Sequence, residues 1–505
     1  MPATLAPAEK PVPPILVLAV VLVVLGLALL RTLMAAETDF VADEAYYAFW
    51  SLHLSPGYFD HPPAIAWLMA LGRLVSESSL GARLAALAGP LIISLALYRT
   101  GAILLDRGAG LLAVLWYNLS VGAQLSLLAT PDVPSTLFWM LATWAVAEFM
   151  RTRNANWWLA VGLFAGLGVL GKYTNLFFGV GVLALIVSAR PRWTWLGLWQ
   201  LWAGGAIALL VVAPNLVWNA QNGWVTFLFQ GGRISHDPMV SDVGAGYLEL
   251  LGAQALFLGP IIVLAFLAAI PAYALRASRW SGLTWPLLSI LPGLLYFAIH
   301  GARARVEANW LLPFWPMASL IAAHLLLSGL SGTRLRRIFR GGLVGLQTLL
   351  SLVLTGILAW VALAHPAGLE HLDRTRDMRG WLDTARQLDR FADAAGARWI
   401  AVPGGYGTVG LFAANLHFIG DDRRVVPVDG LDRYTFLDLD PAALPFPAIL
   451  VDEQSNSERF GALFGTVTEL GTIERRWRNE VLGRYTVLSI AAPTPAFFEA
   501  MAKSD

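Results

Sequence analysis

The sequence predicts a polytopic α-helical membrane protein followed by a small soluble α/β domain. Hydrophobic residues make up 57% of the 505 residues and charged residues only 14%, whereas roughly 25% of the residues in soluble domains are charged. Such an excess of apolar side chains needs lipid as part of its solvent. Near residue 365 charged residues become frequent and the long apolar runs end. We therefore expect a transmembrane domain over residues 1–365 and a soluble domain over residues 366–505.

Apolar runs long enough to cross a membrane, which takes roughly 20 residues, recur about eleven times. The first run is expected to be an uncleaved span, because Met34-Ala35-Ala36 is only a weak candidate for a signal-peptidase site. The expected spans lie at about 14–34, 82–104, 108–128, 132–150, 156–171, 174–189, 196–217, 248–273, 282–300, 310–329 and 341–364.

The charged residues between these runs predict a cytoplasmic N-terminus. Basic residues gather in alternate loops, as the positive-inside rule requires: Lys10, Arg99, Arg107, Arg151, Arg153, Arg190, Arg192, Arg276, Arg279, Arg334, Arg336, Arg337 and Arg340. The other loops hold acidic residues: Glu37, Asp39, Asp43, Glu44, Asp60, Glu77, Asp132, Asp237 and Asp242. An odd number of spans then places the C-terminal domain on the outer face.

The C-terminal residues have the pattern of a small α/β domain. Residues 370–395 read as an amphipathic helix. Short apolar segments bounded by Gly, Pro and Asp follow, and these are typical of strands. The expected strands lie at Trp399–Pro403, Ala448–Asp452 and Tyr485–Ile490.

The first outer loop, at about 35–81, is too long for a simple turn between spans. Aromatic and Leu residues follow Asp43 as far as Leu54, and a second apolar segment follows Pro62-Pro63, a pair that suits the first turn of a helix. Each segment is too short to span a membrane. We expect two helices that lie in the interface plane, each preceded by acidic residues.

Asp43 and Glu44 have two readings. Acidic residues at a helix N-terminus stabilise the helix through its dipole. The functional reading rests on Asp60-His61, which opens the second short helix and can face the same pocket. A carboxylate that is partly shielded from water can act as a general base on a hydroxyl. The four residues could also form an oxygen-rich metal site, although no ligand set requires a metal.

Two further charged residues lie at outer membrane edges. Asp132 begins the fourth expected span, where a helix N-cap is the structural alternative to a pocket role. Lys172 lies in the turn between two spans. A lysine at membrane depth is costly and therefore suggests function, but it can also snorkel to the interface.

The segment from His300 to Trp310 contains Arg303 and Arg305 in a short outer loop, against the general charge pattern. The fork of an arginine matches the oxygens of a phosphate, so these residues predict an anion site. The alternative is an ion pair with Glu307 or with carboxylates of the first loop.

Composition excludes some classes of function. The chain has no cysteine, so it can form neither a disulfide nor a thiolate metal site. Its net charge of +1 gives no support to a nucleic-acid partner. A transporter or flippase remains an alternative, but such proteins favour ionisable residues near the middle of the membrane.

Together these residues resemble the GT-C superfamily of membrane glycosyltransferases. The similarity is to the bacterial branch of the dolichyl-phosphate-mannose–protein mannosyltransferase family, which includes the aminoarabinose transferase of lipid A. It rests on motifs that follow one another along residues 10–330: Asp43-Glu44, Tyr58-Phe-Asp-His61-Pro62-Pro63, Thr130-Pro-Asp132, Gly-x-Leu-Gly-Lys172 and Arg303-x-Arg305-x-Glu307-x-Asn309-Trp310. Where the aminoarabinose branch has Lys before the double proline, this chain has His61, which puts the donor sugar in question.

The resemblance implies an enzyme of the bacterial inner membrane that acts on the periplasmic face. It would transfer a sugar, with inversion, from a polyprenyl-phosphate donor to a hydroxyl of lipopolysaccharide, lipid A, another glycan or a protein. Asp43 would be the catalytic base, with Glu44 beside it. The donor phosphate would be held by Arg303, Arg305, Lys172 and His61. The substrate pocket would include Tyr47, Asp60, Asp132, Glu307, Asn309 and Trp310.

Overall fold

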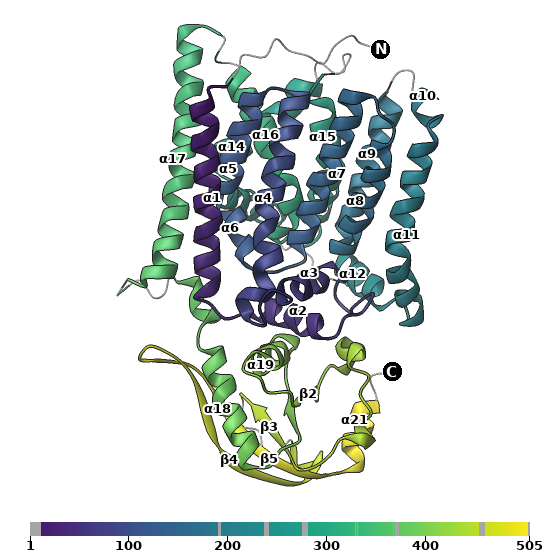
Figure 1. Ribbon diagram of the computed structural model, residues 1–505, viewed down its shortest axis with the longest axis vertical. Coiled ribbons are helices and arrows are strands. Elements are labelled where there is room, and N and C mark those ends of the chain that lie inside the picture. The colour runs from purple at the N-terminus through teal and green to yellow at the C-terminus, as the bar shows by residue number, and fades with distance from the viewer. Residues whose placement is uncertain are drawn as a thin grey trace. The chain divides into compact units, whose positions relative to one another are not determined.

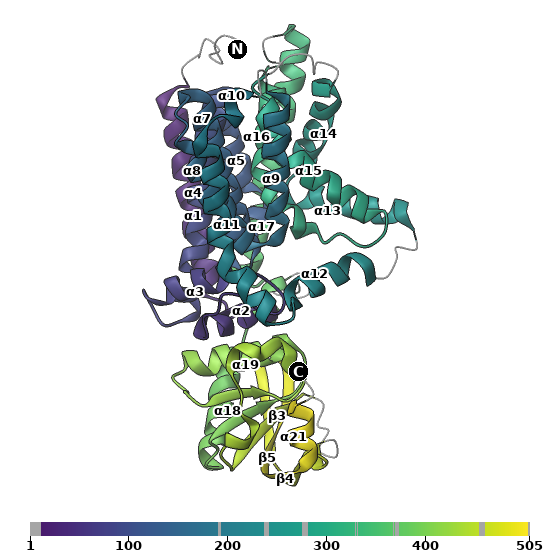
Figure 2. The ribbon, with the colours of Figure 1, turned by 90° about the vertical axis from the view of Figure 1, so that its right-hand side faces the viewer.

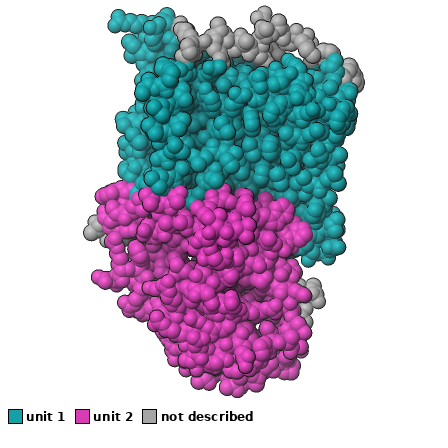
Figure 3. Space-filling view, in the orientation of Figure 1, with its two compact units in different colours: residues 1–31, 86–127, 131–359 teal, residues 32–85, 128–130, 360–505 magenta. Residues whose placement is uncertain are grey.

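The computed structural model of this protein divides into two compact units (Figure 3). The structure describes residues 12–189, 193–236, 242–274, 281–328, 330, 332–366, 368, 373–453 and 460–502. Six of the charged residues used for orientation lie outside these residues: Lys10, Arg190, Arg192, Asp237, Arg276 and Arg279. We call residues 1–31, 86–127 and 131–359 the helical unit, and residues 32–85, 128–130 and 360–505 the mixed unit.

The helical unit is a bundle of apolar helices (Figure 1). Its helices are α1 (Pro14–Ala36), α4 (Ser79–Leu104), α5 (Arg107–Leu119), α6 (Val121–Gln124), α7 (Asp132–Thr152), α8 (Trp157–Gly171), α9 (Leu176–Ser188), α10 (Trp193–Leu196), α11 (Trp199–Gln221), α12 (Val225–His236), α13 (Val243–Phe257), α14 (Pro260–Ala274), α15 (Thr284–Gly301), α16 (Trp315–Ser328) and α17 (Arg334–Ala364). The last residues of α1 and the first residues of α4 belong to the mixed unit.

Every expected span coincides with a helix or a helix pair, but the count of eleven is not confirmed. Within the described residues seven helices are long and apolar enough to cross a membrane, or up to nine if each of two bent pairs is one span. The difference lies in α8 and α9, which are apolar but too short by the same measure. The chain is therefore a helical membrane protein with seven to nine candidate spans.

Two expected spans are broken. The span expected at 108–128 bends by 62° between α5 and α6, where Ser120 is extended and its hydroxyl accepts from the N–H of Ala123. The span expected at 248–273 bends by 118° between α13 and α14 (Figure 2). At that break Gly259 has φ +117°, a conformation open to glycine, and Pro260 starts the next helix. Apolar composition predicted the length of these segments but not their breaks.

Arg31 of α1 satisfies the backbone at the first break. Its side chain is fully buried, and it donates to the Oδ1 of Asn118 (2.9 Å) and the Oε1 of Gln124 (3.2 Å). It also donates to the carbonyl of Asn118 (3.4 Å), near the C-terminal end of α5. A cation stabilises a helix C-terminus, where carbonyls lack intrahelical partners. A buried guanidinium therefore supplies one of the hydrogen bonds that the helix break removes.

The mixed unit contains a five-stranded sheet with the order β2-β1-β3-β5-β4. The strands are β1 (Trp399–Val402), β2 (Arg424–Pro427), β3 (Ala448–Asp452), β4 (Phe464–Trp477) and β5 (Glu480–Pro493). β1 is parallel to β2 and β3, whereas β5 is antiparallel to β3 and β4. β1 is buried along its whole length and β3 over its first four residues, which accounts for their unbroken apolar sequences. The three expected strands are confirmed as β1, β3 and part of β5.

The helices of the mixed unit are α2 (Ala42–Leu52), α3 (Ala64–Arg73), α18 (Trp381–Ala394), α19 (Tyr406–Phe418) and α21 (Pro495–Ala502). They differ from expectation at the start of α18, and two further helices, α19 and α21, were not foreseen. The two short helices of the first loop are confirmed as α2 and α3. The helix expected at 370–395 begins only at Trp381, because its N-cap Gly380 has φ +78° and the residues Arg374–Met378 form a separate 3-10 turn. Residues 369–372 lie outside the described residues.

Candidate active site

The acidic pair at the start of α2 consists of one buried and one exposed carboxylate. Asp43 and Glu44 both lie in the first turn of the helix, which confirms the expected charges at its N-terminus. Asp43 is exposed to solvent, whereas Glu44 has an exposed fraction of 0%. Adjacent residues on a helix point about 100° apart, so one faces outward while the other enters the interior. Their chemistry is correspondingly different.

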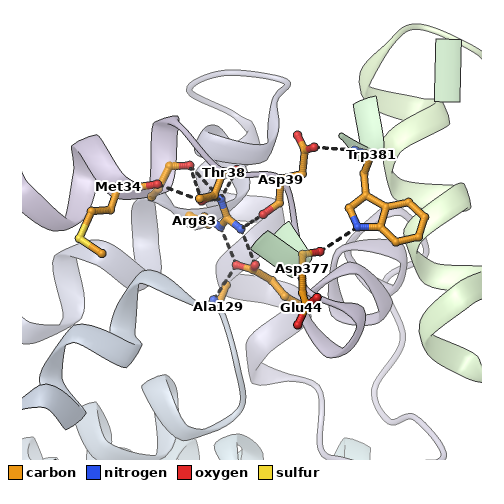
Figure 4. A network of polar contacts seen from close by, with 9 residues as sticks. Met34, Thr38, Asp39, Glu44, Arg83, Ala129, Asp377 and Trp381 are labelled. Atoms are coloured by element: carbon orange, nitrogen blue, oxygen red, sulfur yellow. Dashed lines mark hydrogen bonds and ion pairs between the residues drawn. The ribbon is translucent and has the colours of Figure 1, made fainter. Parts of the chain in front are cut away.

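Glu44 is held by Arg83 of α4 (Figure 4). The Nε of Arg83 donates to Glu44 Oε1 (2.7 Å), and its Nη2 donates to Oε2 (2.5 Å). The N–H of Ala129 also donates to Oε1 (2.8 Å). Both oxygens are engaged by permanent partners, so the geometry favours the structural reading of Glu44 over a catalytic one.

The other donors of Arg83 fix the backbone that leads into α2. Its Nη1 donates to the carbonyls of Ala35 (2.8 Å) and Thr38 (2.7 Å), and its Nη2 donates to the carbonyl of Asp39 (2.6 Å). The side chain of Asp39 accepts from the N–H of Trp381 (2.7 Å), as Figure 4 shows. Arg83 therefore connects the end of α1 with the start of α2, and the side chain of Asp39 connects the same segment with the start of α18.

Asp43 is in contact with the C-terminal part of the mixed unit. Its Oδ1 accepts a hydrogen bond from the hydroxyl of Tyr406 (2.7 Å), the first residue of α19. Two glycines allow α19 to approach α2 so closely. A Cβ atom on Gly407 would lie 2.7 Å from the Cβ of Ala42, and one on Gly410 would lie 2.6 Å from the backbone N of Tyr46. Any larger residue at either position would push the two helices apart.

Asp60 is buried, with an exposed fraction of 7%, and forms an ion pair with Arg433. The guanidinium of Arg433 also lies over the ring of Phe59, 4.8 Å from its centre, and over that of Tyr406, at 5.1 Å. The charge of Asp60 adds to the effect of burial and raises the pKa of the neighbouring Tyr46 phenol. The negative charge of Asp60 is thus balanced by the guanidinium of Arg433, which lies in the C-terminal region of the sequence.

Aromatic rings surround these carboxylates. Trp50 of α2 is stacked on Tyr58, with ring centres 4.2 Å apart. The hydroxyl of Tyr58 donates to the carbonyls of Trp50 (3.1 Å) and His53 (2.9 Å), which fixes the turn that carries Asp60. The ring of His61 lies 6.1 Å from that of Tyr47. Tyr47 and His61 are thus neighbours, and the roles of Tyr47, Asp60 and His61 stay predictions.

A second group of expected residues meets in the helical unit. Asp132 Oδ1 accepts from the Nζ of Lys172 (2.7 Å), and its Oδ2 accepts from the Nδ2 of Asn309 (2.8 Å). The structural alternative for Asp132 was wrong: it is the first residue of α7, its side chain does not cap the helix, and Pro131 occupies the N-cap position. The ammonium of Lys172 is mostly buried against Asp132. Lys172 is therefore paired within the bundle and does not reach toward solvent.

Arg305 lines a cavity of about 690 Å³ in the helical unit. Its Nη2 lies 2.9 Å from the Oε1 of Glu249 on α13, and its Nε lies 3.7 Å from the Oε1 of Glu307. The expected pairing with Glu307 is thus present, and Glu249 was not foreseen. Asn309 also lines the cavity.

Arg303 and Trp310 differ in exposure. The side chain of Arg303 is exposed and has no ion-pair partner among the residues that the structure describes. Trp310 packs against the rings of Phe297 and His300, each with its centre 5.8 Å away. Arg303 therefore keeps its charge available to a ligand, whereas Trp310 helps to fix the end of α15.

Comparisons with known proteins find a family and solved structures that this chain resembles. Residues 60–218 match the family described as dolichyl-phosphate-mannose-protein mannosyltransferase. The structure of ArnT from Cupriavidus metallidurans in the apo state covers 95% of this chain and 98% of its own, with a TM-score of 0.59 and 13% identity. The structure of the same protein bound to undecaprenyl phosphate covers 94% and 98%, with a TM-score of 0.59 and 15% identity. Similarity at this level of identity shows the fold.

The chain has the GT-C fold. The expected resemblance is thereby confirmed, and the family match contains Asp60, His61, Asp132 and Lys172.

Sequence relatives of this GT-C chain come from Rhizobium johnstonii. The lipid A galacturonosyltransferase RgtD is 31% identical over 60% of this chain and 65% of its own length. The lipopolysaccharide core galacturonosyltransferase RgtB is 27% identical over 54% and 57%, respectively. A second core enzyme, RgtA, is 27% identical over 57% and 61%. The chain thus spans less than two thirds of the length of the curated relatives that it matches.

Several partners of the site residues in this GT-C chain could not be found from the sequence. Arg83 lies at the start of an apolar span, and Tyr406 and Arg433 are more than 360 residues from the carboxylates that they contact. The one local signal is the Gly407-x-x-Gly410 spacing, which places two small residues on one face of a helix. Within the described residues no group of three or more His, Asp or Glu side chains is arranged to hold a metal ion.

The Asp132 cluster of the GT-C chain gives a prediction for stability. Lys172→Met leaves the buried Asp132 without its cation, so we expect it to lower the free energy of unfolding by about 1–3 kcal/mol. Asn309→Ala removes one neutral donor from the same carboxylate and is expected to cost about 1 kcal/mol. Thermal unfolding of both purified variants measures the difference. Equal midpoints for Lys172→Met and the wild type would show that this ion pair contributes no stability.

Proposed function

We propose that this chain is a glycosyltransferase that moves a galacturonosyl residue from a polyprenyl-phosphate donor to lipid A or to the lipopolysaccharide core. The observation that carries the proposal is the exposed carboxylate of Asp43 at the start of α2, fixed beside a buried Glu44–Arg83 pair. Three galacturonosyltransferases among the relatives support the sugar and the acceptor class. The similar ArnT structure with bound undecaprenyl phosphate supports a lipid-phosphate donor.

Asp43 would act as the general base. Its carboxylate takes the proton of the acceptor hydroxyl while that oxygen attacks the anomeric carbon of the donor. The bond from the anomeric carbon to the phosphate oxygen breaks, and polyprenyl phosphate leaves with the electron pair. A single displacement of this kind inverts the configuration at the anomeric carbon. Glu44 would act only by positioning α2, because both of its oxygens are engaged.

Arg303 and Arg305 would bind the donor phosphate. Positive charge near the leaving oxygen stabilises the transition state in which that charge develops. Arg303 has no competing ion pair among the described residues, whereas Arg305 would have to exchange Glu249 or Glu307 for the phosphate. Lys172 is engaged by Asp132, so we assign it a secondary role. Within the mixed unit, Tyr47, Asp60 and His61 would contact the substrate; within the helical unit, Asn309 and Trp310 would do so.

The proposed site faces the periplasm of a bacterium, and the chain lies in the inner membrane. This orientation rests on the distribution of Lys and Arg between the loops. The mixed unit would then lie outside the cytoplasm, where lipopolysaccharide intermediates and lipid-linked sugars meet. No soluble nucleotide sugar is needed on that side, which agrees with a lipid-linked donor.

The proposal is tested with envelope glycolipids and with purified protein. Mass spectra of lipid A and core from cells that lack the protein are expected to lose one uronic-acid increment. Purified protein with undecaprenyl-phosphate galacturonic acid should restore that increment on the same acceptor. If the increment disappears in cells but the purified protein transfers nothing, the chain is a flippase or transporter. Unchanged glycolipids in both assays would reject the proposal.

A further inference from the structure

A residue far along the chain contacts the proposed base. The hydroxyl of Tyr406 donates to Oδ1 of Asp43 (2.7 Å), and both residues belong to the mixed unit. Among the described residues no other side chain forms a hydrogen bond with Asp43. Asp43 Oδ2 is therefore left for a further partner, and the orientation of this exposed carboxylate depends on Tyr406.

The ring of Tyr406 is itself held on several sides. Its centre lies 5.0 Å from that of Tyr46 on α2, and the guanidinium of Arg433 lies over the Tyr406 ring, 5.1 Å from its centre. Arg433 is anchored by its ion pair with Asp60. The glycines at 407 and 410 bring the start of α19 against α2. These contacts restrict the ring, so the position of its hydroxyl is set before any substrate binds.

The phenol of Tyr406 is a dependable donor. Burial raises its pKa, and the hydrogen bond to Asp43 and the negative charges of Asp43 and Asp60 raise it further. The hydroxyl thus stays protonated throughout the neutral range, and its hydrogen points at a carboxylate that can only accept.

We propose that Tyr406 is a positioning residue for Asp43, supplied by the C-terminal part of the chain. The inference rests on the proposed function of Asp43 as base. By holding one carboxylate oxygen, Tyr406 directs the other toward the acceptor hydroxyl. Geometry of this kind contributes to the chemical step because the reacting groups must be aligned when the proton moves. The C-terminal segment is then a part of the catalytic site and more than a neighbouring domain.

The test compares two Tyr→Phe variants in the full-length protein. Tyr406→Phe keeps the ring and removes the hydroxyl, so we expect kcat to fall about 10-fold, as for the loss of one hydrogen bond to a charged group near the surface. KM for undecaprenyl-phosphate galacturonic acid is expected to stay the same. The control is Tyr434→Phe, because the Tyr434 hydroxyl is buried in the same aromatic cluster without a hydrogen-bond partner among the described residues. This variant should retain the wild-type kcat.

Thermal unfolding of each variant separates positioning from folding. The midpoint for Tyr406→Phe should match the wild type, because the ring contacts remain. An unchanged kcat, an equal loss of kcat in both variants, or a loss of kcat together with a lower midpoint would each overturn the role of Tyr406. If the wild-type protein itself transfers no sugar, the proposed function fails and this inference fails with it; an active wild type beside an unaffected Tyr406→Phe rejects the inference alone.

Discussion

Asp43→Asn is expected to lower sugar transfer by at least about 100-fold while the protein folds normally. A positioned general base contributes roughly 10²–10⁴-fold to a rate, and the amide of Asn cannot take the proton of the acceptor hydroxyl. The side chain of Asp43 is exposed, and an Asn oxygen can still accept the hydrogen bond from Tyr406. Neither burial nor packing changes, so stability should be preserved.

The measurement is single-turnover transfer from undecaprenyl-phosphate galacturonic acid at saturating donor. Asp383→Asn is a matched control, because it removes the same charge from an exposed carboxylate of α18, where Asp383 pairs with Arg386. This control should be as active as the wild type. Full activity of Asp43→Asn would exclude Asp43 as the base and would point to another carboxylate of the first loop.

Glu44→Gln is expected to lower the stability of the fold and to have little direct effect on sugar transfer, the reverse of Asp43→Asn. The change leaves the fully buried guanidinium of Arg83 without a counter-charge. Removing one partner of a buried ion pair costs about 3–5 kcal/mol of folding free energy. The loss should be visible as a lower yield and a lower midpoint of thermal unfolding. Any remaining folded protein should keep a substantial part of its activity, because Asp43 is untouched.

A double variant checks that the pair itself is responsible. Glu44→Leu with Arg83→Met removes both charges together, and such a replacement is less costly than the loss of one partner. The double variant should therefore be more stable than Glu44→Gln, although Ala129 and the carbonyls before α2 lose their partners. If Glu44→Gln unfolds at the wild-type midpoint and transfers no sugar, Glu44 is catalytic and its structural reading is wrong.

Local pattern predicted part of the secondary structure of this protein, but not α19, β2 or β4. The helices α2 and α3 follow from short apolar segments after Asp43 and after Pro62-Pro63, and β1 and β3 follow from short apolar runs between turn residues. These features depend on interactions between residues that are only a few positions apart in the sequence, so they can be predicted from local pattern. The breaks at Ser120 and Gly259 were missed because apolar composition measures the length of a span and not its straightness.

The sequence by itself determined that this chain is a helical membrane protein with an acidic first loop and a later α/β segment, because hydrophobicity and its periodicity are local properties. It also placed Asp43 and Glu44 side by side, and the family resemblance favoured Asp43 as the base. Only the tertiary structure gave a physical difference between them, by burying Glu44 against Arg83 and leaving Asp43 exposed beside Tyr406. The partner of a charge is chosen by packing between distant segments, and that choice decides whether a carboxylate supports the fold or remains available for chemistry.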